Sequence, residues 1–368
     1  MNQIRKVASG ALLAGAVAAC AAVAAPPAAA VVDGERVASG DAPWAVSLRG
    51  QPVRTLPMAH ACSATVIGPR RVLTARHCVE HAYMWRAEVM VGSDDPDRRP
   101  GRAVPIARTW VPGLYDWSGP GTDAAGGDVA VIETARDIPA PAVPLTAPGT
   151  VLAKDEPVWP YGFGHTDFAQ SKPKEPALLR RAAMLAHTAA ECAESDFGND
   201  PTWLCASRSA GPGGGIVAPG DSGGGVVRQL PGGGLEQVGV VSAGTRGTLG
   251  ATTSGFTSVA VTHAFVTQPE RGVELPRPRG RSRLKGTARV GARVRCEAGF
   301  TPAVRRVVIR WSATSRGARA LSYRSGADGL KLPAATAGRQ LTCMAEGQLR
   351  FEEYGALADP SRPVEVKR

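Results

Sequence analysis

Short runs of apolar residues alternate with turns rich in glycine and proline along most of the chain. Short β-branched runs separated by turn residues are typical of a β-barrel or a β-sandwich. The spacing of apolar residues suits a helix only over residues 176–187. The pattern therefore predicts an all-β fold with that one exception. The clearest predicted strands are residues 44–48, 64–67, 71–74, 129–132 and 238–241, followed after residue 286 by 287–297, 307–311 and 339–344.

The chain begins with a different pattern. Arg5 and Lys6 precede a run of mostly alanine and glycine over residues 7–25, which two prolines and three alanines follow. A basic start, an apolar run and small residues at its end are typical of a cleaved signal peptide. The run is barely long enough to span a membrane. We therefore expect secretion with residues 1–30 removed. The alternative is lipidation at Cys20, because the preceding residues resemble a lipoprotein signal.

Composition indicates two modules. The 368 residues suffice for two domains, and 43% hydrophobic residues with 44 glycines argue against disorder or a coiled coil. Residues 271–368 contain 21 lysines and arginines against 8 aspartates and glutamates, a net +13, whereas residues 1–270 contain 22 against 24. Residues 275–285 combine proline, glycine and five basic side chains, as expected of an exposed linker. The predicted domains are residues 31–270 and 286–368, joined by a linker over 271–285.

Secretion makes disulfides permissible. Apart from Cys20, six cysteines remain, and they fall into three local pairs. Pairing within each local pair is one of 15 connectivities, and it keeps each bridge inside one segment. No Cys-x-x-Cys occurs and no histidines stand at ligand spacing, so we expect no metal site and no cofactor. The expected disulfides are Cys62–Cys78, Cys192–Cys205 and Cys296–Cys343.

Three short motifs contain the candidate chemistry. Residues 73–78 read LTARHC and place His77 beside a cysteine, residues 127–132 read GDVAVI and place Asp128 at the start of an apolar strand, and residues 219–224 read PGDSGG and place Ser222 in a glycine-rich turn. A serine hydroxyl is a weak nucleophile, so an imidazole must accept its proton and a carboxylate must orient that imidazole. Each motif alone could be a turn or an ordinary surface residue, and Asp123 competes with Asp128.

Together, in the order His, Asp, Ser, these motifs resemble the trypsin-like (chymotrypsin-fold) serine proteases from residue 31 to about 270. The resemblance implies a double six-stranded antiparallel β-barrel, with Ser222 as nucleophile, His77 as general base and then acid, and Asp128 as the orienting carboxylate. It also implies an oxyanion hole formed by the backbone N–H groups of Gly220 and Ser222. The other histidines are expected to have no catalytic role: His60, His81, His165, His187 and His263.

Further positions follow from the same resemblance. Residues 31–34 resemble the mature N-terminus of the family, which implies that the freed α-amino group of Val31 pairs with Asp221. Since three alanines precede Val31, signal-peptide cleavage alone could release it, without a separate zymogen segment. The alternative is that Asp221 caps its turn by local hydrogen bonds.

The family's specificity residues are only partly recognisable. Ile216 stands at the expected base of the specificity pocket, where an acid would be needed to bind arginine or lysine, so we expect apolar residues at P1. The segment from Ser242 to Gly244 resembles the one that pairs with the substrate backbone. The family's additional bridge near the nucleophile is absent, because Ala218 occupies its place. Arg76 stands where the family usually has alanine, so it must reach solvent or a counter-ion.

The C-terminal module resembles bacterial immunoglobulin-like repeats in its order of Cys296, Trp311 and Cys343, which predicts a small β-sandwich. The alternative is an unrelated small β-domain held by one disulfide. Its net charge favours an anionic cell-wall polymer or acidic lipid surface as partner. Nucleic acid is not expected, because no aromatic platform accompanies the charge. A basic face that only confers solubility is the other interpretation.

The sequence thus predicts a secreted serine endopeptidase that acts on protein or peptide substrates through a Ser-His-Asp triad and an acyl-enzyme. One alternative is a secreted binding protein that uses a catalytically silent protease scaffold. Another is a hydrolase of esters, because the same acyl-transfer chemistry serves both bonds. The intact trio favours the enzyme.

Overall fold

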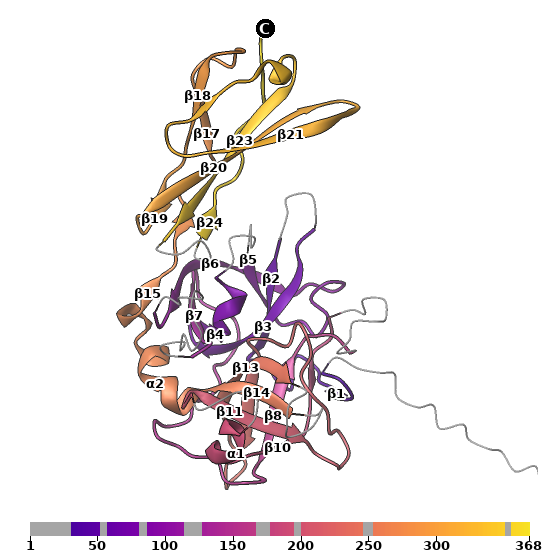
Figure 1. The fold of residues 1–368 in the computed structure, drawn as a ribbon. Helices are drawn as coiled ribbons and strands as arrows, with labels where there is room; N and C mark the ends of the chain where they lie inside the picture. The colour runs from indigo at the N-terminus through magenta and orange to yellow at the C-terminus, as the bar shows by residue number, and fades with distance from the viewer. Residues whose placement is uncertain are drawn as a thin grey trace, which may run out of the picture.

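A computed structural model describes residues 31–51, 57–80, 87–113, 127–166, 177–194, 200–245, 253–349 and 355–368. In these residues the chain forms two β-barrels followed by a C-terminal domain of three small sheets (Figure 1). The predicted signal peptide, Cys20, His81 and Asp123 lie outside the described residues. No helix in the described ranges is both long and apolar enough to cross a membrane.

Six antiparallel strands close the N-terminal barrel: β2 (Ala45–Gly50), β3 (Ala59–Gly68), β4 (Arg71–Thr74), β5 (Ala87–Val91), β6 (Arg102–Val111) and β7 (Ala130–Thr134). Within the described chain their order is β6-β5-β2-β3-β4-β7, and a further pairing of β6 with β7 completes the barrel. Closure leaves these six strands no free sheet edge. A short 3-10 helix, η1 (Arg76–Cys78), directly follows β4.

The second barrel also has six strands in the described residues: β8 (Pro157–Gly162), β10 (Met184–Ala186), β11 (Trp203–Arg208), β12 (Gly225–Gln229), β13 (Leu235–Thr245) and β14 (Thr253–Ser258). Their order is β8-β10-β11-β14-β13-β12, and β8 also pairs with β12. Two short strands, β1 (Glu35–Arg36) and β9 (Arg180–Arg181), extend this sheet beyond β8. The remaining elements are α1 (Ala189–Ala193), α2 (Val259–Thr267) and η2 (Pro269–Arg271).

The prediction of a helix over residues 176–187 is wrong. The described part of this segment contains β9 and β10 instead. Ala182, Met184 and Ala186 are buried while the residues between them are partly exposed, which is the two-residue period of a strand. Pairing with β8 and β11 therefore overrides the weak helical periodicity of the isolated segment.

One buried hydrophobic cluster spans both barrels and fixes their relative position, and the second barrel has a further cluster of its own. Val46 and Leu73 from the first barrel belong to the same buried cluster as Tyr161, Val227 and Val240 from the second. The ring centroids of Trp44 and Tyr161 lie 4.7 Å apart in an edge-to-face arrangement. Because the core is continuous, loops from both barrels can be held together at one site.

The C-terminal domain is a small β-sandwich. Its two main sheets have the orders β17-β18-β22 and β21-β20-β23-β24, with β25 added beside β23, and β16 and β19 form a third sheet of two short strands. Cys296 and Cys343 join the two sheets by a disulfide, and Trp311, 1% exposed, belongs to the same buried core. The elements are β16 (Arg277–Pro278), β17 (Arg283–Lys285), β18 (Arg293–Glu297), β19 (Phe300–Thr301), β20 (Arg306–Ser315), β21 (Ala318–Ser325), β22 (Leu330–Lys331), η3 (Ala334–Thr336), β23 (Gln340–Gln348), β24 (Gly355–Leu357) and β25 (Val364–Glu365).

The segment predicted as a linker, residues 271–285, forms short strands. Its first part, β15 (Val273–Glu274), pairs with β6 of the N-terminal barrel. Leu275 is buried with Val111 and Ala130, and Leu349 of the C-terminal domain packs against the same cluster. β16 and β17 then pair within the C-terminal domain. The segment therefore contacts the domains on both sides.

Candidate active site

The candidate histidine and aspartate are held together by two hydrogen bonds. His77 lies in η1, and Asp128 directly precedes the buried Val129 and strand β7. The backbone N–H of His77 donates to Oδ1 of Asp128 over 3.0 Å, and Nδ1 of the imidazole lies 2.7 Å from Oδ2. Because a carboxylate only accepts, Nδ1 carries the proton and Nε2 is left to accept one.

The surroundings favour a charged histidine and a charged aspartate. Burial acts to lower the pKa of His77, but the hydrogen bond and charge of Asp128 outweigh it, and with the charge of Glu80 they raise that pKa above its usual value. Burial acts to raise the pKa of Asp128, but the hydrogen bonds from His77 and Ser242 and the charge of His77 hold it below its usual value. Asp128 is therefore suited to stabilise a protonated His77.

Ser222 lies in a tight turn between the barrels. Its carbonyl accepts a hydrogen bond from the backbone N–H of Ser63 on β3 over 2.8 Å, and Sγ of Cys78 lies 3.7 Å from the same oxygen. These contacts place the serine beside the segment that carries His77. Within the described residues, no hydrogen bond joins Nε2 of His77 to Oγ of Ser222. Such bonds often tighten only when substrate binds.

The same turn presents two free backbone donors. The N–H groups of Gly220 and Ser222 make no hydrogen bond to any part of the chain that the structure describes, whereas those of Asp221, Gly223 and Gly224 all do. Gly220 has φ +95°, and a Cβ there would lie 2.9 Å from Cα of Gly164. The turn therefore requires glycine at this position, and its two free donors can bind an oxyanion.

The sequence interpretation missed the role of His60 in this turn. Nε2 of His60 lies 2.9 Å from the carbonyl oxygen of Gly220, to which Oγ of Ser63 also donates over 2.9 Å. Nδ1 of His60 lies 2.8 Å from Oγ of Ser47. These three side chains orient the Gly220 peptide and with it the free N–H groups. The only sequence signal for His60 is its position two residues before Cys62.

Ser242 and Glu80 also have contacts that local patterns did not reveal. Ser242, expected to pair with substrate, donates through Oγ to Oδ2 of Asp128 over 2.5 Å. Arg76, which needed solvent or a counter-ion, forms an ion pair with Glu80, and the two side chains are 0% and 3% exposed. The guanidinium also donates to the carbonyl of Gly113.

Asp221 is fully buried beneath the turn. Its carboxylate accepts hydrogen bonds from the backbone N–H groups of Gly164 and Ala218, both over 2.8 Å. Burial nevertheless raises the pKa of Asp221 to about 7, against these bonds and the positive charge of Arg180. In this intact chain the nitrogen of Val31 is a peptide nitrogen, so the pairing of a freed Val31 amine with Asp221 stays a prediction. The local capping predicted as its alternative is present in the bond from Ala218.

The expected specificity residues lie in two segments, residue 216 outside the named strands and residues 242–244 on β13. Ile216 is half-buried, and its N–H donates to the carbonyl of Val32 over 3.1 Å. Ser242 occupies an irregularity between β13 and β14, and Gly244 on β13 is exposed. An exposed strand segment here leaves backbone groups accessible to an extended peptide.

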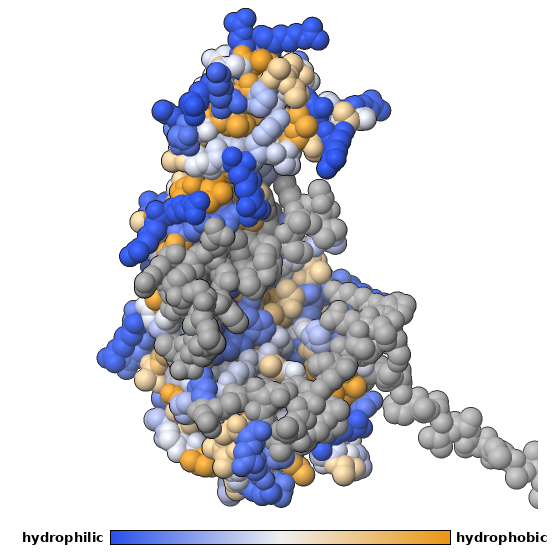
Figure 2. All heavy atoms as spheres, in the orientation of Figure 1, coloured by the Kyte–Doolittle hydropathy of each residue, from blue (hydrophilic) through white to orange (hydrophobic). Residues whose placement is uncertain are grey.

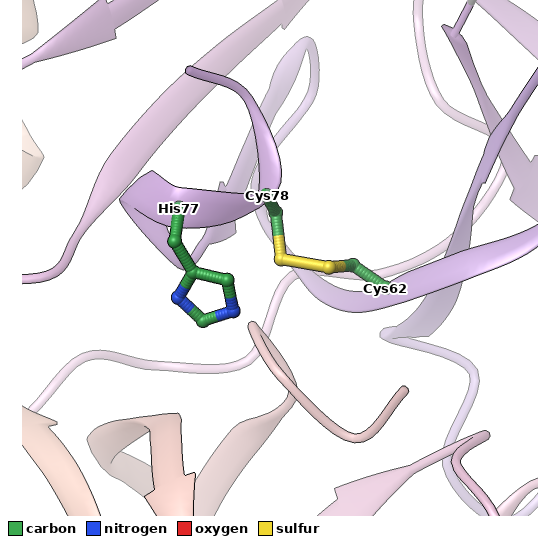
Figure 3. Close-up of side chains that lie close together, drawn as sticks. All are labelled: Cys62, His77 and Cys78. Atoms are coloured by element: carbon green, nitrogen blue, oxygen red, sulfur yellow. A yellow bond between two sulfur atoms is a disulfide. The ribbon is translucent and has the colours of Figure 1, made fainter. Parts of the chain in front are cut away.

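The three expected cysteine pairs are all disulfides: Cys62–Cys78, Cys192–Cys205 and Cys296–Cys343. Figure 3 shows the first of them beside the imidazole of His77. One ring nitrogen and the two sulfurs lie within 4.8 Å of one another, a spacing compatible with a metal site. Because the sulfurs are bonded to each other, this group offers no thiolate ligand.

Comparison with known proteins agrees with this geometry. The family model Trypsin matches residues 31–266. Transmembrane protease serine 9 of Rattus norvegicus is 30% identical over 115 residues, which are 29% of this chain and 9% of that protein. Fibrinolytic enzyme, isozyme C, of Lumbricus rubellus is 25% identical over 227 residues, which are 58% of this chain and 86% of that protein. The family match covers well over half of the chain, which therefore belongs to the trypsin family.

Proposed function

We propose that the protein is a secreted serine endopeptidase that hydrolyses peptide bonds through Ser222, His77 and Asp128. The observation that carries this proposal is the pair of hydrogen bonds between His77 and Asp128, at a turn that offers Ser222 and two free N–H groups. A silent scaffold has no need to keep these groups together. Protein or peptide substrates are the ones that the family membership favours.

In the first half of the reaction, Nε2 of His77 accepts the proton of the Ser222 hydroxyl while Oγ attacks the scissile carbonyl carbon. Asp128 keeps the proton of the neutral ring on Nδ1 and stabilises the imidazolium that forms. The imidazolium then protonates the leaving amine, and the acyl-enzyme remains on Ser222. In the second half, His77 accepts a proton from a water molecule, which attacks the acyl carbonyl carbon. The imidazolium then returns the proton to Oγ of Ser222 as the acid product leaves.

The negative charge of the tetrahedral intermediate develops on the former carbonyl oxygen. The N–H groups of Gly220 and Ser222 are the donors for this oxygen in the proposed mechanism. Loss of one such donor typically costs ~10²–10³ in rate. His60 and Ser63 hold the Gly220 carbonyl and thereby keep the adjoining N–H groups in place.

For specificity, we propose that the segment from Ser242 to Gly244 pairs with the substrate backbone and that Ile216 contributes an apolar pocket base. An unpaired cationic side chain buried there would cost several kcal/mol. Digestion of a peptide library, read by mass spectrometry, should therefore show cleavage after apolar residues. A digest dominated by cleavage after arginine or lysine would contradict this assignment of Ile216.

Active-site labelling separates the enzyme from the silent scaffold. A fluorophosphonate probe should modify the wild-type protein at Ser222 and leave Ser222→Ala unmodified. An unlabelled wild-type protein would favour the binding-protein alternative. The alternative that the protein hydrolyses esters rather than peptides is tested by comparing kcat/KM on an ester and on the amide of the same peptide. Turnover of the ester alone would make the protein an esterase.

The start of the chain supports the proposal that the protein is secreted and that signal-peptide cleavage leaves Val31 as first residue. N-terminal sequencing of the exported, active protein should begin at Val31. Active protein that begins at Pro26, or at a lipidated Cys20, would contradict this maturation.

We also propose that the C-terminal domain is immunoglobulin-like and holds the protease on an anionic surface. The inter-sheet disulfide, which lies in the same core as Trp311, supports an immunoglobulin-like fold. The net charge of +13 over residues 271–368 supports retention on an anionic surface. Figure 2 shows strongly hydrophilic side chains projecting from this domain. Retention of the full chain on anionic cell-wall preparations or acidic vesicles should fall steeply as salt approaches 1 M, where the Debye length is about 3 Å. Salt-independent retention, or none at low salt, would contradict a role of the charge.

A further inference from the structure

The outer face of the C-terminal sandwich presents two rows of side chains across three strands, and all but one of these side chains are polar. In the first row, Arg310 on β20 lies opposite Arg324 on β21 and Met344 on β23. In the second row, Ser312 lies opposite Ser322 and Thr342 on the same strands. Residues opposite each other in antiparallel strands point to the same face, as do residues two apart along a strand. The six side chains therefore share one surface.

This surface is hollowed. A depression of about 550 Å³ is lined by all six of these residues. Trp311 and Cys343, which alternate with them, point into the core of the sandwich and are 1% exposed. The two rows on the outer face therefore form most of the depression, which we call the arginine groove. Besides these six residues, Trp311, Tyr323 and Pro360 also line it.

The charges in the arginine groove are not balanced. Two cations opposite each other on neighbouring strands repel. Glu346 neutralises only one of them, because its carboxylate accepts from Nε and Nη2 of Arg310. The side chain of Arg324 is exposed and makes no hydrogen bond or ion pair with any residue that the structure describes. One net positive charge is thus left beside the hollow.

The polar groups of the groove are matched to one kind of ligand. Arginine donates hydrogen bonds and accepts none, and its planar fork fits carboxylate and phosphate oxygens. The three hydroxyls of the second row can donate to, or accept from, the hydroxyls of a sugar. Among the residues that the structure describes, no carboxylate side chain lines the depression to repel an anion.

We propose that the arginine groove binds an acidic polysaccharide, with Arg324 and Nη1 of Arg310 on its anionic groups and the serine and threonine hydroxyls on its sugar hydroxyls. This site rests on the proposed retention of the protease by its C-terminal domain, and it names the residues responsible. A lipid surface fits less well. The large hydrophobic side chains that are markedly exposed in the described residues are Val151, Val261 and Val364, and none of them lines the groove.

The test uses the full chain and a pair of variants with the same charge change. Arg324→Gln removes a cation from the groove. Arg316→Gln removes one from the exposed turn between β20 and β21, outside the groove. The dissociation constants for fluorescent polygalacturonate and phosphorylated dextran are measured at low salt, with neutral dextran and phosphatidylglycerol vesicles as comparisons. Hydrolysis of a small peptide and the melting temperature monitor the fold.

If the arginine groove is the site, Arg324→Gln weakens polysaccharide binding about tenfold or more, Arg316→Gln changes it less than twofold, and both keep wild-type melting. Ser322→Asp, which adds a negative charge to the groove, should abolish binding. Equal weakening by Arg324→Gln and Arg316→Gln would overturn the groove and leave charge-driven retention standing. A wild-type chain that binds neither acidic polysaccharide, or that prefers the vesicles, would overturn the groove. A wild-type chain that binds neither acidic polysaccharide would also contradict retention on acidic polymers.

Discussion

Arg76 and Glu80 form a buried ion pair immediately beside the candidate histidine. Their side chains are 0% and 3% exposed, and Arg76 belongs to the same 3-10 turn as His77. The negative charge of Glu80 contributes to the raised pKa of His77. A buried ion pair seldom adds net stability, but removing one partner is strongly destabilising. We therefore interpret the pair as part of the surroundings that set the charge of His77.

Replacement of Glu80 tests this interpretation. Glu80→Gln removes a negative charge near His77, so the pKa of that imidazole should fall and the acid limb of kcat/KM should move to lower pH. The single variant leaves Arg76 buried without its partner and should lose about 3–5 kcal/mol of stability. The double variant Arg76→Met, Glu80→Gln should recover stability and keep the shifted acid limb. Glu133→Gln, at a surface ion pair with Arg70, is the control. An acid limb at the wild-type position in the double variant would contradict the role of Glu80.

Ser242→Ala removes the hydrogen bond to Asp128. The bond helps to hold the pKa of Asp128 low and fixes the carboxylate that orients His77. A hydrogen bond to a charged group contributes about 1.5–3 kcal/mol, so kcat/KM should fall by roughly 10–100-fold while the protein remains folded at the assay temperature. Ser93→Ala, whose hydroxyl donates to the carbonyl of Arg99, is the matched control and should keep its rate. Equal rates in the two variants would show that the Ser242 bond has no part in catalysis.

Gly220→Ala should damage the oxyanion turn. The new Cβ would lie 2.9 Å from Cα of Gly164, and Gly220 has φ +95°. We expect a loss of about 10²–10³ in kcat, as for removal of one oxyanion donor. Gly232→Ala is the control, because Gly232 has φ +108° but open space around it. Similar losses of activity in both variants would attribute the effect to backbone strain rather than to the oxyanion turn.

Asp221 predicts a pH dependence of stability in the unprocessed chain. Its pKa is raised from 3.8 to about 7, so the folded state binds more protons than the unfolded state between these values. Stability should therefore fall as pH rises from about 4 to 7 and change little above that range. If the freed amine of Val31 pairs with Asp221, a chain that begins at Val31 should lose this decline. Urea unfolding of both chains at pH 4, 5.5, 7 and 8 measures it, and identical profiles would argue against the pairing.

Much of the fold follows from local pattern, because β-branched runs between glycine and proline turns specify strands. The trio of His77, Asp128 and Ser222 was also recognisable, because each stands in a distinctive short motif. The helix prediction for residues 176–187 is wrong, because strands remote in the sequence pair with this segment and determine its structure. His60 and Glu80 were missed for the same reason: the partner of His60 is 160 residues away, and burial of Glu80 depends on the folded loop around it.

The most direct test of Ser222 as the nucleophile is the rate of peptide hydrolysis by Ser222→Ala. The substitution removes only the hydroxyl proposed as nucleophile, and the carbonyl of Ser222 still accepts from the N–H of Ser63. We expect acyl-enzyme formation to disappear while the melting temperature stays within about 1–2 °C of wild type, with at most ~10³–10⁴-fold catalysis over water left from the oxyanion donors and substrate binding. The control Ser39→Ala removes a hydroxyl from the turn that precedes β2 and should retain full activity. Wild-type turnover by Ser222→Ala would show that Ser222 is not the nucleophile.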